Sequence, residues 1–314
     1  MRCIFMGSPP FAMPVFEALL ESGHSVLALV TRPDKPRGRG REIVPSDLVV
    51  MAQAAGVPVL QPTTTKTEAF VAELSAFQPD ILLVASYGEI LTENVLRLAP
   101  KGALNIHGSL LPRWRGAAPI QRAVAAGDEE TGVSVQRMVL ALDEGDVLLE
   151  RRMKIEADDT SGSLFDKLAL LGGEVATAAL DAMAFENPCF TPQVEADATY
   201  ARKLRKVEGE VDWSLDATQL ERHVRAMSPW PGAKAATADG KPLVIERAML
   251  SAREGAAPGT VLELSPNLVV ACGRGALELH QVKPAGKRAM EAQAWCRGAR
   301  LELGNKLLGG AEAK

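Results

Sequence analysis

Short apolar segments that alternate with amphipathic helical ones constrain the first 185 residues of this chain most. The predicted strands cover 2–6, 25–30, 80–85 and 102–107, and the predicted helices cover 11–20, 46–55, 67–77 and 89–98. Strands joined in turn by helices form parallel βαβ units. We therefore predict an α/β fold with a Rossmann-like, doubly wound and mostly parallel sheet.

This pattern ends near residue 186, after a predicted long helix over 161–185. Prolines follow at 188 and 192, and then short β-rich stretches separated by turns. Short strands at this spacing are typical of a small barrel. The sequence thus predicts an α/β domain at 1–186, a linker at 187–206, and an OB-like β-barrel domain at 207–314.

The composition excludes several classes of protein. Charged residues make up 24% of the 314 residues, and the apolar runs are far shorter than the roughly 18 residues of a membrane helix. The strand at 2–6 leads directly into a Gly-Ser-Pro-Pro turn, which does not fit a secretory leader. The four cysteines form no CxxC pair, and the four histidines lack metal-ligand spacing. We expect a cytoplasmic monomer without a metal.

Charge is divided unevenly between the two parts of the chain. Residues 1–199 carry 17 Lys/Arg and 26 Asp/Glu, a net of −9, whereas residues 200–314 carry 18 and 13, a net of +5. Within the acidic part, residues 32–41 hold five cations and one anion. A basic loop and a basic domain favour a polyanionic partner. The alternative is a solvated loop beside a mildly basic domain.

Two polar residues end the predicted strand at 102–107. Asn105 and His107 are two residues apart, so their side chains leave the same face of the sheet. Open α/β sheets place their ligands at such carboxyl ends. An amide donor beside an imidazole suits stabilisation of an oxyanion together with proton transfer. A hydrogen-bonded structural histidine is the alternative reading of His107.

A carboxylate that orients His107 is expected from the turn Leu142-Asp-Glu-Gly-Asp146. Asp143 and Asp146 both fit, and local sequence does not separate them. The turn at Gly7-Ser-Pro-Pro10 lacks the GxGxxG pattern of dinucleotide-binding loops, which argues against a nicotinamide oxidoreductase.

The longest motif runs from Asn105 to Gln121, as Asn-Ile-His-Gly-Ser-Leu-Leu-Pro-Arg-Trp-Arg-Gly-Ala-Ala-Pro-Ile-Gln. With it stand Val84-Ala-Ser-Tyr-Gly88, Leu142–Asp146 and Pro229-Trp-Pro-Gly-Ala233. Through these motifs the chain resembles the methionyl-tRNA formyltransferases almost from end to end. The resemblance implies transfer of the formyl group of 10-formyltetrahydrofolate to the methionine amino group of initiator methionyl-tRNA, in translation initiation.

The resemblance also implies roles for particular residues. The family's catalytic residues fall on Asn105, His107 and Asp143, which selects Asp143 over Asp146. Implied contacts with the folate cofactor are Ser109, Leu110, Leu111, Pro112, Tyr87 and Gly88. Implied contacts with tRNA are Arg37, Arg39, Arg41, Lys203 and Lys206. One departure is Arg202, where the family pattern has a proline.

Three other functions remain as alternatives. A formyltransferase acting on an amino-sugar nucleotide would share the catalytic residues and the Ser-Leu-Leu-Pro motif. The basic loop and the net +5 of residues 200–314 favour tRNA over that substrate and over a formyltetrahydrofolate hydrolase. A non-catalytic RNA-binding protein would not need Asn105, His107 and Asp143 together.

Overall fold

The computed structural model describes residues 1–37, 42–185 and 187–310, and these form two compact units. Unit 1 comprises residues 1–119, 130–154 and 165–201. Unit 2 comprises residues 120–129, 155–164 and those from Arg202 onward. The domain boundaries at 186 and 207 stay a prediction, since these units draw two short segments of the first 186 residues into unit 2.

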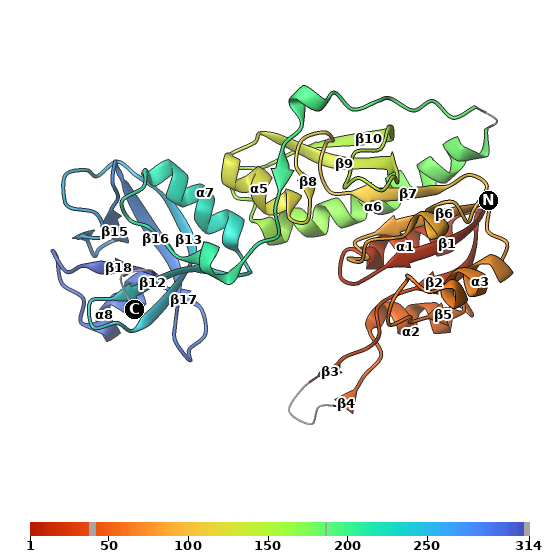
Figure 1. The fold of residues 1–314 in the computed structure, drawn as a ribbon. Helices are drawn as coiled ribbons and strands as arrows, with labels where there is room; N and C mark the ends of the chain where they lie inside the picture. Colours follow the sequence, from red (N-terminus) through yellow and green to blue (C-terminus); the bar gives the residue numbers. More distant parts are fainter. Residues whose placement is uncertain (38–41, 186, 311–314) are drawn as a thin grey trace. The chain divides into compact units, whose positions relative to one another are not determined.

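A seven-stranded sheet forms the centre of unit 1, in the order β10-β9-β7-β6-β1-β2-β5 (Figure 1). Strands β7 to β5 run parallel, and β9 and β10 are antiparallel at one edge. The predicted Rossmann-like, mostly parallel sheet is confirmed. Its strands are β1 (Arg2–Gly7), β2 (Ser25–Val30), β5 (Val59–Leu60), β6 (Ile81–Ala85), β7 (Ala103–His107), β9 (Glu130–Arg137) and β10 (Val147–Lys154).

Helices cover both faces of this sheet. On one face Phe5 of β1 stacks on Phe16 of α1, and α6 approaches α1 closely. That approach requires Gly173, because a Cβ there would lie 2.9 Å from the Ala18 Cβ. On the other face, α3 and α4 bury an apolar cluster that includes Phe70 and Leu74. The helices are α1 (Ala12–Glu21), α2 (Asp47–Ala54), α3 (Glu68–Ala76), α4 (Glu93–Leu96) and α6 (Ser161–Ala184), whose first turn belongs to unit 2.

Unit 1 also carries two small strand pairs. An arm that extends from the body of the unit ends in the antiparallel pair β3 (Pro36–Arg37) and β4 (Glu42–Ile43) (Figure 1). The parallel pair of β8 (Arg115–Gly116) and β11 (Tyr200–Ala201) joins the loop after β7 to the predicted linker. A short 3₁₀ turn, η1 (Glu195–Asp197), precedes β11. Part of the predicted linker is therefore integrated into unit 1.

One predicted helix is much shorter than expected. The sequence predicts a helix over 89–98, whereas α4 spans only Glu93–Leu96. Thr92, within the predicted range, has an extended backbone (φ −78°, ψ 160°) and serves as the N-cap, so the helix begins only after it. The chain thus forms a loop between β6 and α4.

Unit 2 is built on an antiparallel sheet in the order β14-β15-β16-β13-β12-β18, with β17 pairing with β16. This curled sheet is consistent with the predicted small barrel. Helices α7 and α8 pack beside it, around buried Trp213, Trp295 and Leu277. The elements are α5 (Pro119–Ala126), η2 (Lys206–Gly209), α7 (Ala217–Met227), β12 (Ala233–Thr237), β13 (Pro242–Ser251), β14 (Val261–Glu263), β15 (Leu268–Ala271), β16 (Ala276–Pro284), β17 (Met290–Glu291), α8 (Ala292–Ala299) and β18 (Leu307–Gly309).

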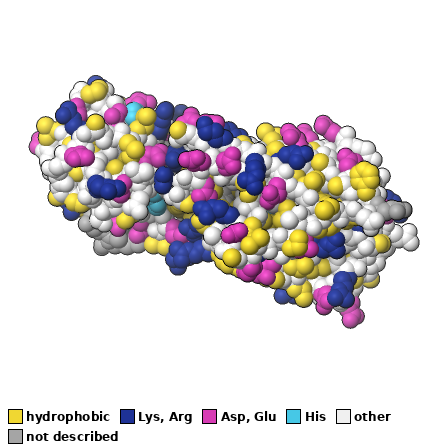
Figure 2. Space-filling view, turned by 90° about the horizontal axis from the view of Figure 1, so that it is seen from above, with side chains coloured by type: hydrophobic (Ala, Val, Ile, Leu, Met, Phe, Trp, Pro, Cys, Tyr) yellow, Lys and Arg dark blue, Asp and Glu magenta, His cyan; other side chains and the backbone are white. Residues whose placement is uncertain are grey.

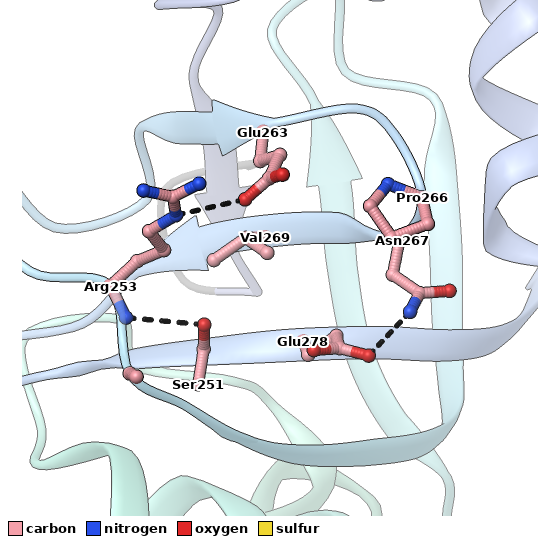
Figure 3. A pocket seen from close by; sticks show the side chains of 8 residues that line it. Ser251, Arg253, Glu263, Pro266, Asn267, Val269 and Glu278 are labelled. Atoms are coloured by element: carbon pink, nitrogen blue, oxygen red, sulfur yellow. Dashed lines mark hydrogen bonds and ion pairs between the residues drawn. The ribbon is translucent and has the colours of Figure 1, made fainter.

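A polar hollow of about 380 Å³ lies on the sheet of unit 2 (Figure 3). In it Arg253 Nε donates to Glu263 at 3.0 Å, and Asn267 Nδ2 donates to Glu278 at 2.5 Å. Arg253 and Glu263 are thus paired with each other, and the Glu278 carboxylate accepts from a neutral amide. Across the described part of the chain, no helix has the length and apolar character needed to cross a membrane.

Candidate active site

The carboxyl end of β7 places Asn105 and His107 on one face of the unit 1 sheet. Strand β9 fixes their surroundings, because Asn105 lies opposite Gln136 and His107 lies opposite Ser134 in the antiparallel register. The His107 side chain is 7% exposed. Both predicted side chains therefore lie on a rigid strand and next to polar neighbours.

Asp143 reaches both of these residues from the turn between β9 and β10. Its Oδ1 accepts from Asn105 Nδ2 at 3.3 Å and from Gln136 Nε2 at 2.8 Å. Its Oδ2 accepts from the Gly116 backbone N–H at 2.8 Å and lies 3.6 Å from His107 Nδ1. The structure thus brings together Asn105, His107 and Asp143, the three residues expected to be catalytic.

The turn has an unusual backbone that aims Asp143 inward. Asp143 has a φ of 55°, in the left-handed region that residues with a Cβ seldom adopt. Two residues on, a Cβ at Gly145 would lie 1.7 Å from the Arg137 carbonyl oxygen. Glycine is therefore required at 145 for the turn to close against β9.

His107 is held through both ring nitrogens. Nδ1 faces Asp143, and Nε2 lies 2.9 Å from the Trp114 carbonyl oxygen. Both neighbours are acceptors, so they fix the orientation of the ring. The two ring nitrogens therefore have defined neighbours, as a group that relays a proton requires.

The predicted folate contacts at 109–112 form a loop that is tied to β9. Ser134 Oγ donates to the Ser109 carbonyl at 2.8 Å and accepts from the Leu111 N–H at 3.0 Å. The Ser109 hydroxyl itself donates to the Arg113 carbonyl at 2.6 Å. Ser109 and Leu111 are buried, whereas Leu110 and Pro112 are partly exposed. The loop therefore has a fixed backbone directly after the strand that carries His107.

Tyr87 and Gly88, the other predicted folate contacts, lie in the loop after β6. The Tyr87 side chain is 2% exposed, and burial, together with the nearby charge of Glu89, raises its pKa to about 12. The Gly88 carbonyl accepts from Arg32. The phenol therefore lies in the apolar core, and the backbone of Gly88 is what this loop presents.

The predicted tRNA contacts fall in two places. Arg39 and Arg41 lie outside the described residues, as does the side chain of Arg37, which ends β3. Lys203 and Lys206 are exposed in unit 2. On the face seen in Figure 2, Lys and Arg side chains are interspersed with Asp and Glu, so no single patch of one sign dominates it.

Next to Lys206 lies a carboxylate surrounded by arginines, all within unit 2. Glu208 Oε2 accepts from Arg122 Nη2 at 2.7 Å and lies 3.5 Å from Arg202 Nη2. Its Oε1 lies 3.7 Å from Arg205 Nε. This cluster carries three guanidinium charges and one carboxylate charge.

Sequence reasoning missed two glutamines beside Asp143. Gln136 could have been found from the register of β9 against β7, since it lies opposite Asn105. Gln193 has no such signal, because it follows α6 in the predicted linker and reaches Asp143 only in the folded chain.

This sheet, with its Asn, His and Asp at one strand end, is that of a formyl transferase: residues 1–180 match the formyl transferase model, and residues 203–300 match the model of the formyl transferase C-terminal domain. Curated methionyl-tRNA formyltransferases from Methylococcus capsulatus and Marinobacter nauticus are 47% and 44% identical to this chain, over 93% and 92% of its length and 95% and 93% of theirs. The chain belongs to the methionyl-tRNA formyltransferase family.

A solved structure shares the fold at much lower identity. WlaRD, a sugar 3N-formyl transferase crystallised in the presence of dTDP and 5-N-formyl-THF, has a TM-score of 0.66 and 13% identity. The match covers 91% of this chain and 98% of WlaRD. At this identity the likeness concerns the fold alone.

Proposed function

We propose that this chain transfers the formyl group of 10-formyltetrahydrofolate to the amino group of methionine on initiator methionyl-tRNA. The observation that carries the proposal is the convergence of Asn105, His107 and Asp143 in a chain 47% identical to a methionyl-tRNA formyltransferase. We further propose that it acts as a cytoplasmic monomer, with the catalytic domain at 1–186 and the tRNA-binding domain at 207–314.

The proposed reaction begins with attack of the neutral methionyl amine on the formyl carbon, which gives a tetrahedral oxyanion. Asn105 has two amide hydrogens, and one of them is given to Asp143. The other is available to the oxyanion, and a donor of this kind typically contributes about 3–4 kcal/mol to lowering the barrier. The amide–carboxylate contact therefore orients the group that stabilises the intermediate.

His107 and Asp143 move the proton in this scheme. The attacking nitrogen must lose a proton, and the folate nitrogen must gain one as the formyl group leaves it. Asp143 lies 3.6 Å from His107 Nδ1 and orients the ring. A substrate atom that accepts from Nε2 would take the place of the Trp114 carbonyl, which lies 2.9 Å from it.

The folate is proposed to bind along the loop at 109–112. Two hydrogen bonds fix that loop's backbone, one donated by the Ser134 hydroxyl and one accepted by it, so the loop offers a preformed edge for a flat polar ring. The partly exposed apolar side chains of Leu110 and Pro112 could pack against the flat faces of the folate's pterin ring. In the loop after β6, the backbone of Gly88 is proposed to contact the cofactor, whereas the buried Tyr87 side chain packs in the core and anchors the loop.

The tRNA is proposed to bind through Lys203 and Lys206 of unit 2 and through Arg37, Arg39 and Arg41 of the arm. Cations that contact phosphates release condensed counterions, so tRNA affinity should fall steeply with salt. An amino-sugar nucleotide has few phosphates and would show a shallow dependence. The net +5 of residues 200–314 favours the larger polyanion.

The substrate is tested by supplying the purified chain with 10-formyltetrahydrofolate and either charged initiator tRNA or an amino-sugar nucleotide. We expect formyl-methionyl-tRNA as the product and no formyl-sugar. Formylation of the sugar nucleotide, with charged tRNA left unmodified, would contradict the proposal. As a test of the site, His107→Ala should lower kcat/KM at least about 10²-fold with tRNA affinity retained.

A further inference from the structure

Arg115 is a buried cation for which the proposed reaction has no use. It is 1% exposed and lies in β8, directly before Gly116. Burial alone would lower the pKa of its guanidinium, but hydrogen bonds to Glu195 and Tyr200 raise it, so Arg115 stays charged. Burial of a charge whose partners are exposed costs free energy, so packing alone does not account for a buried arginine here.

One partner of Arg115 connects it to the catalytic turn. Arg115 Nε donates to Gln193 Oε1 at 3.0 Å. Because a guanidinium only donates, the amide oxygen of Gln193 must face it, and this settles the orientation of the amide. The Nε2 group is thereby directed at Asp143.

From this fixed orientation Gln193 contacts three groups around the catalytic carboxylate. Its Nε2 lies 2.8 Å from the Asp143 carbonyl oxygen and 2.7 Å from the Gly145 carbonyl oxygen. It also lies 3.3 Å from Gln136 Oε1, and Gln136 donates to the Asp143 carboxylate. Gln193 therefore touches both ends of Asp143, its backbone directly and its side chain through Gln136.

The turn needs such a restraint. Asp143 adopts a left-handed φ of 55°, which a residue with a Cβ holds only where its surroundings impose it. The two hydrogen bonds from Gln193 satisfy the Asp143 and Gly145 carbonyls and so span the turn. Release of these carbonyls would let the carboxylate move away from His107, which it faces at 3.6 Å.

We infer that Gln193, oriented by Arg115, is a positioning residue that holds Asp143 in its catalytic conformation. The inference rests on the proposed catalytic role of Asp143. It gives a function to the segment between α6 and β11, which crosses the catalytic turn and is fixed by a buried arginine.

The test is Gln193→Glu, which keeps the size of the side chain and its contact with Arg115 but turns a carboxylate oxygen toward two carbonyls. We expect kcat to fall about 10- to 100-fold, as for a catalytic group displaced by about 1 Å, with KM for both substrates within about twofold of wild type. Gln193→Met, which removes the donors without adding a charge, should lower kcat in the same direction. Gln53→Glu, an exposed change on α2, is the matched control and should act as wild type.

A double-mutant cycle separates positioning from a structural role. In an Asp143→Ala background, Gln193→Glu should have no further effect on the residual kcat, because the group it positions is gone. An equal further loss in that background would overturn the inference, as would wild-type kcat for both Gln193 variants. If Asp143→Ala itself kept wild-type kcat, the proposed catalytic site would fail instead, and the two failures are thus distinguished.

Discussion

Two largely buried carboxylates, one in each unit, differ in the charge of the groups that surround them. Asp143 in unit 1 is 11% exposed and accepts from neutral donors, namely two amide side chains and one backbone N–H, with His107 as its ionisable neighbour. Glu208 in unit 2 is 12% exposed and is surrounded by the guanidinium groups of Arg122, Arg202 and Arg205.

This difference in surroundings indicates which of the two carboxylates is suited to a catalytic role. Around Glu208 the charges are permanent, and although burial by itself raises the pKa of this carboxyl, the hydrogen bond from Arg122 and its neighbours lower it overall. Such a group stays ionised and holds η2, α5 and residue 202 together. Around Asp143 three neutral donors fix the position of the carboxylate, and His107 is the ionisable side chain beside it.

The largest effect expected from this comparison is on catalysis at Asp143. Asp143→Ala should lower kcat/KM about 10²-fold or more, because His107 and Asn105 lose the group that orients them. Steady-state kinetics with charged initiator tRNA measures this. A fall of less than tenfold would mean that the neutral donors around Asp143 serve packing rather than chemistry.

Glu208→Ala should have the opposite profile. Removal of the carboxylate leaves Arg122, only 17% exposed, beside two other cations, so the free energy of unfolding should fall by about 2 kcal/mol. Turnover at saturating substrates should stay within about twofold of wild type. Urea denaturation measures the free energy of unfolding. A large loss of turnover with unchanged stability would contradict the contrast drawn between Glu208 and Asp143.

The pH dependence of stability gives a second test of the role of the Glu208 charge. The pKa of Glu208 is lowered in the folded protein from its ordinary 4.5, so its ionised form stabilises the fold above 4.5 and this contribution is lost as the pH falls through the folded value. The difference in unfolding free energy between wild type and Glu208→Gln should therefore be constant from pH 6 to 7 and shrink below about 4.5. A difference that grows toward low pH would contradict the assignment.

The sequence predicts the catalytic residues of the candidate site far better than it predicts Gln193, which lies beside them. Asn105 and His107 follow from strand periodicity, whereas the turn offers both Asp143 and Asp146, and only the family resemblance selects Asp143. Gln193 lies 50 residues beyond Asp143 in a segment without periodicity, and only the pairing of β8 with β11 brings that segment back. Its role depends on tertiary contacts that no local pattern encodes.

The same limit applies to elements of the fold. The parallel sheet of unit 1 is predictable because its strands are short, apolar and separated by helices. The sequence does not predict strand β12, because Ala233-Lys-Ala-Ala-Thr237 is rich in residues with low strand propensity; the strand is held by pairing with β13 and β18 on its two sides. Nor does it predict helix α5, because the first residues of that helix belong to the Asn105–Gln121 motif, which contains two glycines and two prolines.

The smallest expected effect separates two arginines that face the same oxygen of Glu208. Arg122 is 17% exposed and donates to Oε2 at 2.7 Å, whereas Arg202 is 70% exposed and lies 3.5 Å from that atom.

Because solvent screens an exposed pair and its side chain must be ordered to form it, Arg202→Ala should change the free energy of unfolding by less than about 0.5 kcal/mol. Arg122→Ala removes a shielded, hydrogen-bonded partner and should cost about 1–2 kcal/mol, since charged hydrogen bonds contribute more than neutral ones. Chemical denaturation of both variants at low and high salt measures the contrast, and added salt should diminish only the Arg202 effect. Equal costs for the two substitutions would mean that charge around Glu208, rather than burial and geometry, determines its stability.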